Sequence, residues 1–121
     1  LMPTLWKAKQ PYNINVAASA AADAALQDAP YLRKTVAALV AERVRMIAAL
    51  RKIPFLHPYP SESNFILCKV TGRKAGDLTK YLREEHGILI RYFDEAGLKD
   101  HVRISVGKPE QTDVLLNALT G

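Results

Sequence analysis

The chain has 121 residues, of which 49% are hydrophobic and 24% are charged. This length suits one domain with a single hydrophobic core, and the composition excludes wholesale disorder. The net charge of +5 gives only weak support for an anionic partner, because the basic residues are spread along the chain and form no run.

Residues 1–15 contain two prolines and no sustained period, so we expect an irregular segment with at most one short helical turn near residues 4–8. Asn15 can cap a helix that begins at Val16, because the run that follows consists of alanine and other small helix formers. The weakly polar stretch 14–26 is mostly alanine and is short for a membrane span, so no membrane partner is expected.

The alanine-rich helix has few bulky apolar side chains of its own. A larger partner must therefore supply the side chains against which it packs. A larger domain is a natural source, and the absence of an initiator methionine favours a chain that begins inside a longer protein. We therefore assign residues 1–28 to a segment that would join a larger domain, and residues 29–121 to a small domain.

A long amphipathic helix is predicted from Pro30 onward, with Asp28 as its cap and its end before Pro54. Apolar residues recur along it at helical spacing, while charged residues, among them Glu42 and Arg45, take the other faces. This pattern predicts that the charged side chains face solvent.

Short strands and helices alternate after this helix. Prolines restrict the first strand to an edge position near residues 55–57. The remaining predicted elements are a central apolar strand over 64–70, a helix over 74–86 that ends at Gly87 in the left-handed conformation, strands over 88–93 and 101–106, and a final helix that begins at Pro109.

This order predicts an α+β fold, with a small, mostly antiparallel sheet and helices on one face, preceded by two helices. Cys68, the only cysteine, lies within the apolar central strand, so we expect an inert core thiol. A single cysteine cannot form an internal disulfide, which fits a reducing compartment. The histidines His57, His86 and His101 show no metal-ligand spacing and are expected at the surface or at helix ends.

The strand 101–106 carries the main candidate for ligand binding. Its apolar residues alternate with Arg103, which has no large neighbour on its own face of the strand. A guanidinium held on a stiff strand can take a carboxylate or a phosphate through two parallel hydrogen bonds. The pattern alone fits a surface arginine equally well.

Arg91, in the preceding strand, would provide a second guanidinium if strand pairing places it alongside Arg103. A surface role is somewhat better supported for Arg91, because Leu89 and Phe93 share its face. No catalytic set accompanies the two arginines, since the serines lack a nearby histidine and acid in any known spacing, and there is no glycine-rich phosphate loop.

Four ordered motifs carry a family resemblance: PYNIN, YPSESNFIL, GILIRYF and HVRISVGKPEQTDVLLNAL. In order and spacing they resemble the C-terminal part of histidinol-phosphate aminotransferases, which are fold-type-I pyridoxal-phosphate enzymes, and the resemblance covers nearly the whole chain. The run LWKAKQPYNINVA also resembles the plant and algal branch, which implies a plastid location; otherwise a cytoplasmic one is expected.

The resemblance implies the C-terminal small domain of a transaminase of histidine biosynthesis. Such an enzyme converts histidinol phosphate and 2-oxoglutarate to imidazole acetol phosphate and glutamate. Arg103 matches the arginine that grips the substrate's carboxylate, or the corresponding group of histidinol phosphate, and Arg91 would help to hold the phosphate. Tyr12 and Asn13 would line the edge of the active site, although a turn role is as well supported.

One departure from the family limits what this chain can do. The family's Schiff-base lysine lies upstream, with an aspartate for the pyridine nitrogen and an aromatic residue that stacks on the cofactor ring. None of the chain's lysines has that context. The resemblance therefore implies a small domain without its large pyridoxal-phosphate domain, inactive alone, from an enzyme that is a homodimer. The exact amino donor stays open, because related enzymes accept aromatic amino acids.

The sequence also fits two other interpretations. A free-standing basic α+β module could bind a ligand or RNA, with Phe65, Tyr92 and Phe93 as candidate stacking residues, but no RNP-like pattern surrounds them, and no nucleic-acid partner is expected. Alternatively, the chain is an interaction fragment without a ligand of its own, whose alanine-rich helix and irregular start form a docking surface.

Overall fold

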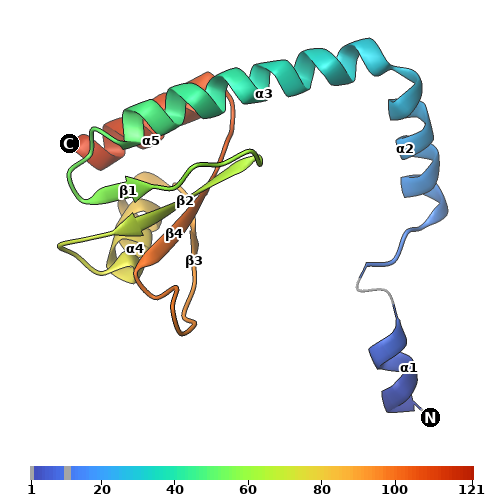
Figure 1. Ribbon diagram of the computed structural model, residues 1–121, viewed down its shortest axis with the longest axis horizontal. Coiled ribbons are helices and arrows are strands. Elements are labelled where there is room, and N and C mark those ends of the chain that lie inside the picture. The colour runs from blue at the N-terminus through green and yellow to red at the C-terminus, as the bar shows by residue number, and fades with distance from the viewer. Residues whose placement is uncertain (1, 10–11) are drawn as a thin grey trace. The chain divides into compact units, whose positions relative to one another are not determined.

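The computed structural model describes residues 2–9 and 12–121. Contacts divide the chain into two compact units, Leu1–Thr35 and Val36–Gly121 (Figure 1). The helix α3, Ala29–Leu50, begins in the first unit and ends in the second. The assignment of residues 1–28 to a larger domain of a complete protein stays a prediction.

The first unit contains α1, Met2–Ala8, and α2, Val16–Gln27, neither of which buries a residue. The seven residues of α1 exceed the single turn that was expected, because a proline in the first helical turn costs no hydrogen bond. Both predicted caps are confirmed. The Asn15 side chain accepts a hydrogen bond from the Ala18 amide at 2.8 Å, and the Asp28 side chain accepts one from the Tyr31 amide at 3.3 Å.

The second unit is built on a four-stranded sheet in which every pairing is antiparallel. Its strand order is β1-β2-β4-β3, so the predicted central position of the most apolar strand, β2, is confirmed. The strands are β1, Leu56–Pro58; β2, Phe65–Val70; β3, Arg91–Tyr92; and β4, His101–Ser105. The helices α4, Ala75–His86, and α5, Pro109–Thr120, complete the unit together with the C-terminal part of α3.

The strand expected over 88–93 is reduced to Arg91 and Tyr92. Gly87 ends α4 in the left-handed conformation at φ +65°, as predicted, and the Ile88 amide donates to the Leu82 carbonyl at 2.9 Å. This cap keeps the backbone after Gly87 hydrogen-bonded to the end of α4. Pairing with β4 therefore begins only at Arg91. The first strand also begins one residue later than expected, because the Leu56 amide closes a turn onto Ile53.

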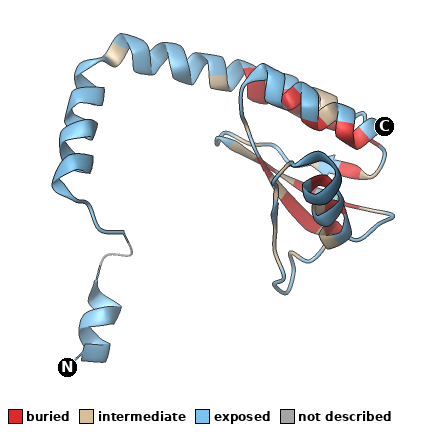
Figure 2. Ribbon diagram, turned by 180° about the vertical axis from the view of Figure 1, so that it is seen from behind, coloured by how far each residue is buried: buried red, intermediate tan, exposed pale blue. Residues whose placement is uncertain are grey.

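The core lies between one face of the sheet and the helices α3, α4 and α5, as the buried residues in Figure 2 show. The strands contribute alternate residues, and the helices contribute one stripe each: Ile66, Cys68, Val70, Val102 and Ile104 from β2 and β4, and Met46, Leu50, Leu78, Leu82, Leu115 and Leu119 from the helices. The predicted α+β fold with helices on one face is thereby confirmed. Burial raises the pKa of the Cys68 thiol to about 12, so the prediction of an inert core thiol is also confirmed.

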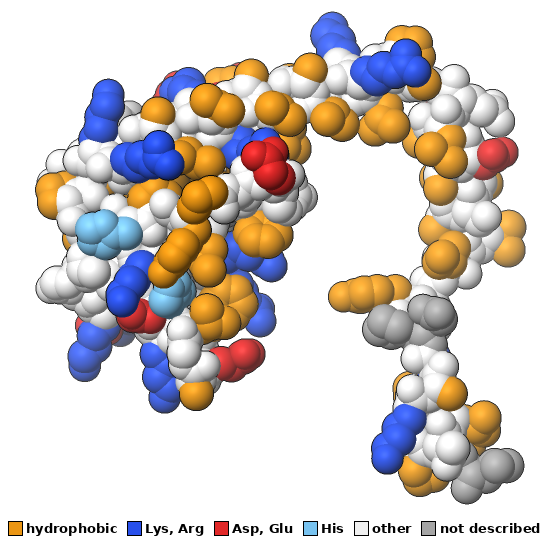
Figure 3. Space-filling view, in the orientation of Figure 1, with side chains coloured by type: hydrophobic (Ala, Val, Ile, Leu, Met, Phe, Trp, Pro, Cys, Tyr) orange, Lys and Arg blue, Asp and Glu red, His pale blue; other side chains and the backbone are white. Residues whose placement is uncertain are grey.

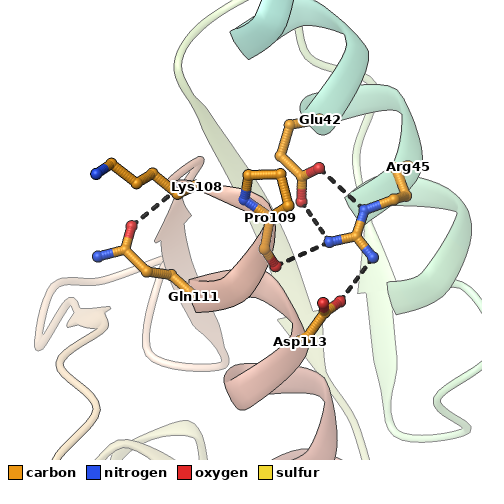
Figure 4. A network of polar contacts seen from close by, with 6 residues as sticks. All are labelled: Glu42, Arg45, Lys108, Pro109, Gln111 and Asp113. Atoms are coloured by element: carbon orange, nitrogen blue, oxygen red, sulfur yellow. Dashed lines mark hydrogen bonds and ion pairs between the residues drawn. The ribbon is translucent and has the colours of Figure 1, made fainter.

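The prediction that the charged residues of α3 face solvent is wrong for Glu42, which is buried. Its carboxylate accepts hydrogen bonds from Arg45 Nε at 2.9 Å and Nη2 at 2.8 Å (Figure 4). The same guanidinium donates to Asp113 Oδ1 at 2.7 Å and to the Pro109 carbonyl at 3.0 Å. Arg45 therefore joins α3 to the first turn of α5, which follows β4 directly.

Another arginine of α3, Arg43, is buried and holds the loop between β1 and β2. It donates to the Ser63 carbonyl at 3.1 Å and to Glu62 Oε2 at 2.7 Å. Within this loop the Ser61 hydroxyl donates to the carbonyl of Phe65, the first residue of β2. The start of β2 is thus fixed to α3 by polar contacts as well as by the core.

The Glu42 contact makes the stability of the fold depend on pH. Hydrogen bonds from Arg45 lower the pKa of Glu42 below its ordinary value of 4.5, although burial opposes this shift. A lowered pKa in the folded state stabilises the protein above the pKa of the unfolded chain, and this contribution is lost as the pH falls through the folded value. We therefore expect Glu42→Gln to lower the free energy of unfolding at pH 7, and the deficit to shrink below about pH 4.5.

Urea unfolding followed by circular dichroism, at a series of pH values, measures this difference. Glu95→Gln is the matched control, because Glu95 is exposed and forms no ion pair within the described residues. It should follow the wild-type pH dependence. A deficit in Glu42→Gln that stays constant from pH 7 to pH 3 would contradict the assignment.

Candidate anion-binding site

The register of β3 and β4 brings the two predicted arginines together. Arg91 is the direct partner of Arg103 in the antiparallel pairing. Opposed residues in such a pair project from the same face of the sheet, with Cα atoms about 4.5–5.5 Å apart. The expectation that strand pairing places Arg91 alongside Arg103 is therefore confirmed.

The two arginines lie on the face of the sheet that the helices leave open. Val102 and Ile104, which flank Arg103 in β4, are buried in the core, so Arg103 projects away from it. Arg103 is half-buried and Arg91 is exposed. Figure 3 shows the basic side chains spread over the visible surface of the second unit, so charge density alone does not identify the site.

Neither guanidinium group is neutralised by a carboxylate of the described residues. In residues 2–9 and 12–121 neither Arg91 nor Arg103 forms an ion pair with a carboxylate, whereas Arg43 and Arg45 do. Arg103 Nε is buried and makes no hydrogen bond. Two like charges on opposed residues repel each other, and an anion between them would relieve the repulsion and satisfy the donors.

The prediction that Arg103 has no large neighbour on its face is wrong. Phe65 of β2 lies diagonally across from it, since Leu67 is the direct partner of Arg103. The Arg103 guanidinium carbon lies 5.1 Å from the centroid of the Phe65 ring, and that of Arg91 lies 5.6 Å from the Phe93 ring. The prediction failed because it considered only residues within the same strand.

His101 was expected at the surface but is buried. It lies two residues before Arg103, in a central strand, and its ring stacks on Tyr59 with centroids 5.7 Å apart. Its Nε2 is 3.2 Å from the Tyr59 hydroxyl, and its Nδ1 is 2.6 Å from Asp100 Oδ1. Sequence reasoning missed this cluster, because Tyr59 is 42 positions away. The expectation holds for His57 and for His86, which ends α4.

Asp100 carries the negative charge of this cluster. Burial opposes its ionisation, but a contact with Lys69 Nζ at 3.4 Å and the neighbouring His101 lower its pKa overall. Asp100 is therefore engaged with Lys69 and His101. It forms no ion pair with Arg103, so it does not neutralise the candidate site.

Tyr12 and Asn13, the other predicted site residues, lie in the first unit. Both are exposed, and Tyr12 is 85% exposed. Their place at the edge of an active site stays a prediction. No group of three or more metal-ligating side chains occurs within the described ranges, and no helix there is long and apolar enough to cross a membrane.

The lysines do not fit the covalent attachment of pyridoxal phosphate. A Schiff-base lysine is held neutral by burial or by a neighbouring cation. All nine lysines of this chain are exposed. Lys69, Lys80 and Lys99 moreover contact carboxylates of neighbouring residues.

Comparisons with known proteins identify the family to which this chain is similar. Residues 2–119 match the family described as aminotransferase class I and II. The chain is 52% identical over 118 residues to the chloroplastic histidinol-phosphate aminotransferase of Nicotiana tabacum, a match that covers 95% of this chain and 28% of that protein. It is equally identical over 118 residues to the histidinol-phosphate aminotransferase of Roseiflexus castenholzii, of which it covers 32%.

Solved structures give the same result for the fold. The crystal structure of histidinol-phosphate aminotransferase from Clostridium acetobutylicum matches with a TM-score of 0.81 and 31% identity, over 93% of this chain and 34% of that one. The enzyme from Sinorhizobium meliloti, in complex with pyridoxal-5'-phosphate, matches with a TM-score of 0.71 and 31% identity, over 79% of this chain and 26% of that one. The chain thus spans about a third or less of the length of these relatives.

The arginine pair predicts a specific stabilisation by inorganic phosphate. A ligand that binds only the folded state stabilises it by RT ln(1 + [L]/Kd), or about 1.4 kcal/mol at ten times Kd. The melting temperature should therefore rise in phosphate relative to chloride at equal ionic strength. Arg103→Gln and Arg91→Gln should lose most of this rise, because each removes one guanidinium.

Thermal unfolding followed by circular dichroism measures the effect. Arg51→Gln is the matched control, because Arg51 is an exposed arginine outside the sheet and should keep the full rise. An equal rise in all three variants would show that phosphate acts through general charge and not through this pair.

Proposed function

The chain belongs to the class I and II aminotransferase family, and on this premise we propose that it is the C-terminal small domain of a histidinol-phosphate aminotransferase. Arg103 and Arg91 bind the anionic groups of the substrate. The observation that carries this proposal is the direct register pairing of the two arginines on the open face of the sheet, where neither pairs with a carboxylate of the described residues.

The relatives support the choice of substrate. Those at 52% identity are histidinol-phosphate aminotransferases, one from a plant chloroplast and one from a bacterium. The proposed reaction converts histidinol phosphate and 2-oxoglutarate to imidazole acetol phosphate and glutamate. Its substrates carry a phosphate dianion and carboxylates, which a planar, permanently charged guanidinium binds through two parallel hydrogen bonds.

The two arginines have separate roles in this proposal. Arg103 takes the carboxylate of 2-oxoglutarate or glutamate, or the corresponding group of histidinol phosphate, and Arg91 helps to hold the phosphate. Together they fix the substrate at one end, so that its amino or keto carbon is presented in a constant orientation. Tyr12 and Asn13 are proposed to line the edge of the active site of the complete enzyme.

Pyridoxal phosphate, when bound in the complete enzyme, supplies the electron sink for transamination. The exposed lysines of this chain do not fit its covalent attachment, so a large pyridoxal-phosphate domain holds it. The chain alone is therefore inactive. The complete enzyme is proposed to be a homodimer, located in a plastid if its source is a plant or an alga and in the cytoplasm otherwise.

The separate roles of the arginines can be tested in the full-length aminotransferase that contains this segment. Arg91→Gln should raise the KM for histidinol phosphate and leave the KM for 2-oxoglutarate unchanged, whereas Arg103→Gln should raise both. Loss of a charge-assisted contact of about 1.5–3 kcal/mol corresponds to about a 10- to 150-fold fall in kcat/KM. Steady-state kinetics with each substrate varied in turn measures these values.

Arg51→Gln serves as the control and should keep the wild-type parameters. If Arg91→Gln raises both KM values equally, the assignment of separate roles is wrong. If neither variant changes kcat/KM, the arginines do not bind the substrate.

The inactivity of the chain by itself has its own test. After incubation with pyridoxal phosphate and reduction by borohydride, the 121-residue chain should show only scattered, substoichiometric lysine adducts, because no lysine is in a buried environment that would favour one site. Peptide mapping by mass spectrometry locates the adducts. A stoichiometric adduct at one lysine would refute the proposal that the cofactor is held elsewhere.

A further inference from the structure

The contact between Arg103 and Phe65 is the basis of a further inference. The guanidinium carbon lies 5.1 Å from the ring centroid, within the range of a cation–π contact. Arg103 has no carboxylate partner, and its buried Nε makes no hydrogen bond to any described residue. The ring is therefore the contact in the described chain that orients this guanidinium.

An aromatic ring orients an arginine differently from a carboxylate. A carboxylate would fix the orientation of the guanidinium group but would also occupy its N–H donors and neutralise its charge. A ring attracts the face of the cation and leaves the N–H donors in the guanidinium plane free. Arg103 thus keeps both its charge and its donors for an anionic ligand.

The backbone of Phe65 is itself held in place. Phe65 is the first residue of β2 and is paired with Ser105 of β4, and its carbonyl accepts a hydrogen bond from Ser61. The buried Arg43 of α3 holds the same loop through the Ser63 carbonyl. The ring is therefore presented from a fixed segment, as a residue that positions another side chain requires.

Arg91 also lies beside an aromatic ring, which comes from the segment that follows its strand. Its guanidinium carbon lies 5.6 Å from the ring of Phe93, the first residue after β3. Each arginine of the pair therefore has one ring beside it. The ring of Phe93 follows β3 directly, so it depends less on tertiary contacts than that of Phe65.

We propose that Phe65 is a positioning residue for substrate binding, which holds the Arg103 guanidinium in its binding orientation through a cation–π contact, and that Phe93 does the same for Arg91. The inference rests on the proposed function, since it concerns how the same arginines are aligned. It adds residues to the site that do not themselves touch the anion.

The test uses the 121-residue chain, labelled with ¹⁵N, and inorganic phosphate as the probe at constant ionic strength. The Nε–Hε signal of Arg103, identified by its loss in Arg103→Gln, should be displaced by the ring current of Phe65. In Phe65→Leu, which keeps apolar bulk and removes the ring, the signal should lose this displacement. Phosphate affinity should weaken about two- to tenfold, as expected for the loss of a cation–π contact.

Two further variants separate orientation from general packing. Phe65→Tyr keeps an aromatic face and should bind phosphate within about twofold of wild type. Phe55→Leu removes the ring that lies 5.2 Å from Arg73, an equivalent contact away from the arginine pair, and should leave phosphate affinity unchanged. In the full-length enzyme, Phe65→Leu should raise the KM for 2-oxoglutarate more than it changes kcat.

Each of these results supports or overturns the proposal that the Phe65 ring positions Arg103. Unchanged affinity in Phe65→Leu, or an equal loss in Phe65→Leu and Phe65→Tyr, would overturn the role of the ring. If Phe65→Leu does not fold, the spectrum of the wild-type chain provides the test. An Arg103 Nε–Hε resonance without ring-current displacement would then overturn the proposed role of Phe65. If Arg103→Gln binds phosphate as tightly as wild type, the proposed function itself fails. If only Arg103→Gln loses affinity, the function stands and the aromatic role fails.

Discussion

The candidate site depends on a ladder of only two residue pairs. In the ladder between β3 and β4, Arg91 faces Arg103 and Tyr92 faces Val102. A shift of the register by one residue would turn Arg91 toward the core and Tyr92 toward solvent, because side chains alternate between the faces of a strand. Tyr92 resists such a shift. It is half-buried, and its ring lies against Gly76 of α4, 3.6 Å from the position that a Cβ would occupy there.

Local signals in the sequence predicted much of this architecture. The caps at Asn15 and Asp28 and the left-handed Gly87 depend on neighbours within a few residues, and each was found as expected. The alternation in β4 placed its core face correctly for the same reason. The face and strand of Arg103 were therefore predictable from the chain alone, while its alignment with Arg91 needed the register.

Tertiary neighbours account for what the sequence did not predict. Glu42 is buried where Arg45 folds back onto it and joins it to α5, and His101 is buried because Tyr59 stacks on it. The ring beside Arg103 comes from another strand, and the strand expected over 88–93 was shortened by the cap at the end of α4. None of these contacts leaves a periodic trace in the sequence. The aromatic residues considered for base stacking have other partners: Phe65 and Phe93 face arginines, and Tyr92 packs on α4.

The single thiol offers a way to follow how this small domain opens. Cys68 lies at the centre of the sheet with no exposed surface, and its burial keeps it protonated at neutral pH. A thiol reagent can therefore modify it only in molecules whose sheet has separated from the helices. Because the chain has no second cysteine, the rate of modification reports the opening of this core without the ambiguity of mixed labelling.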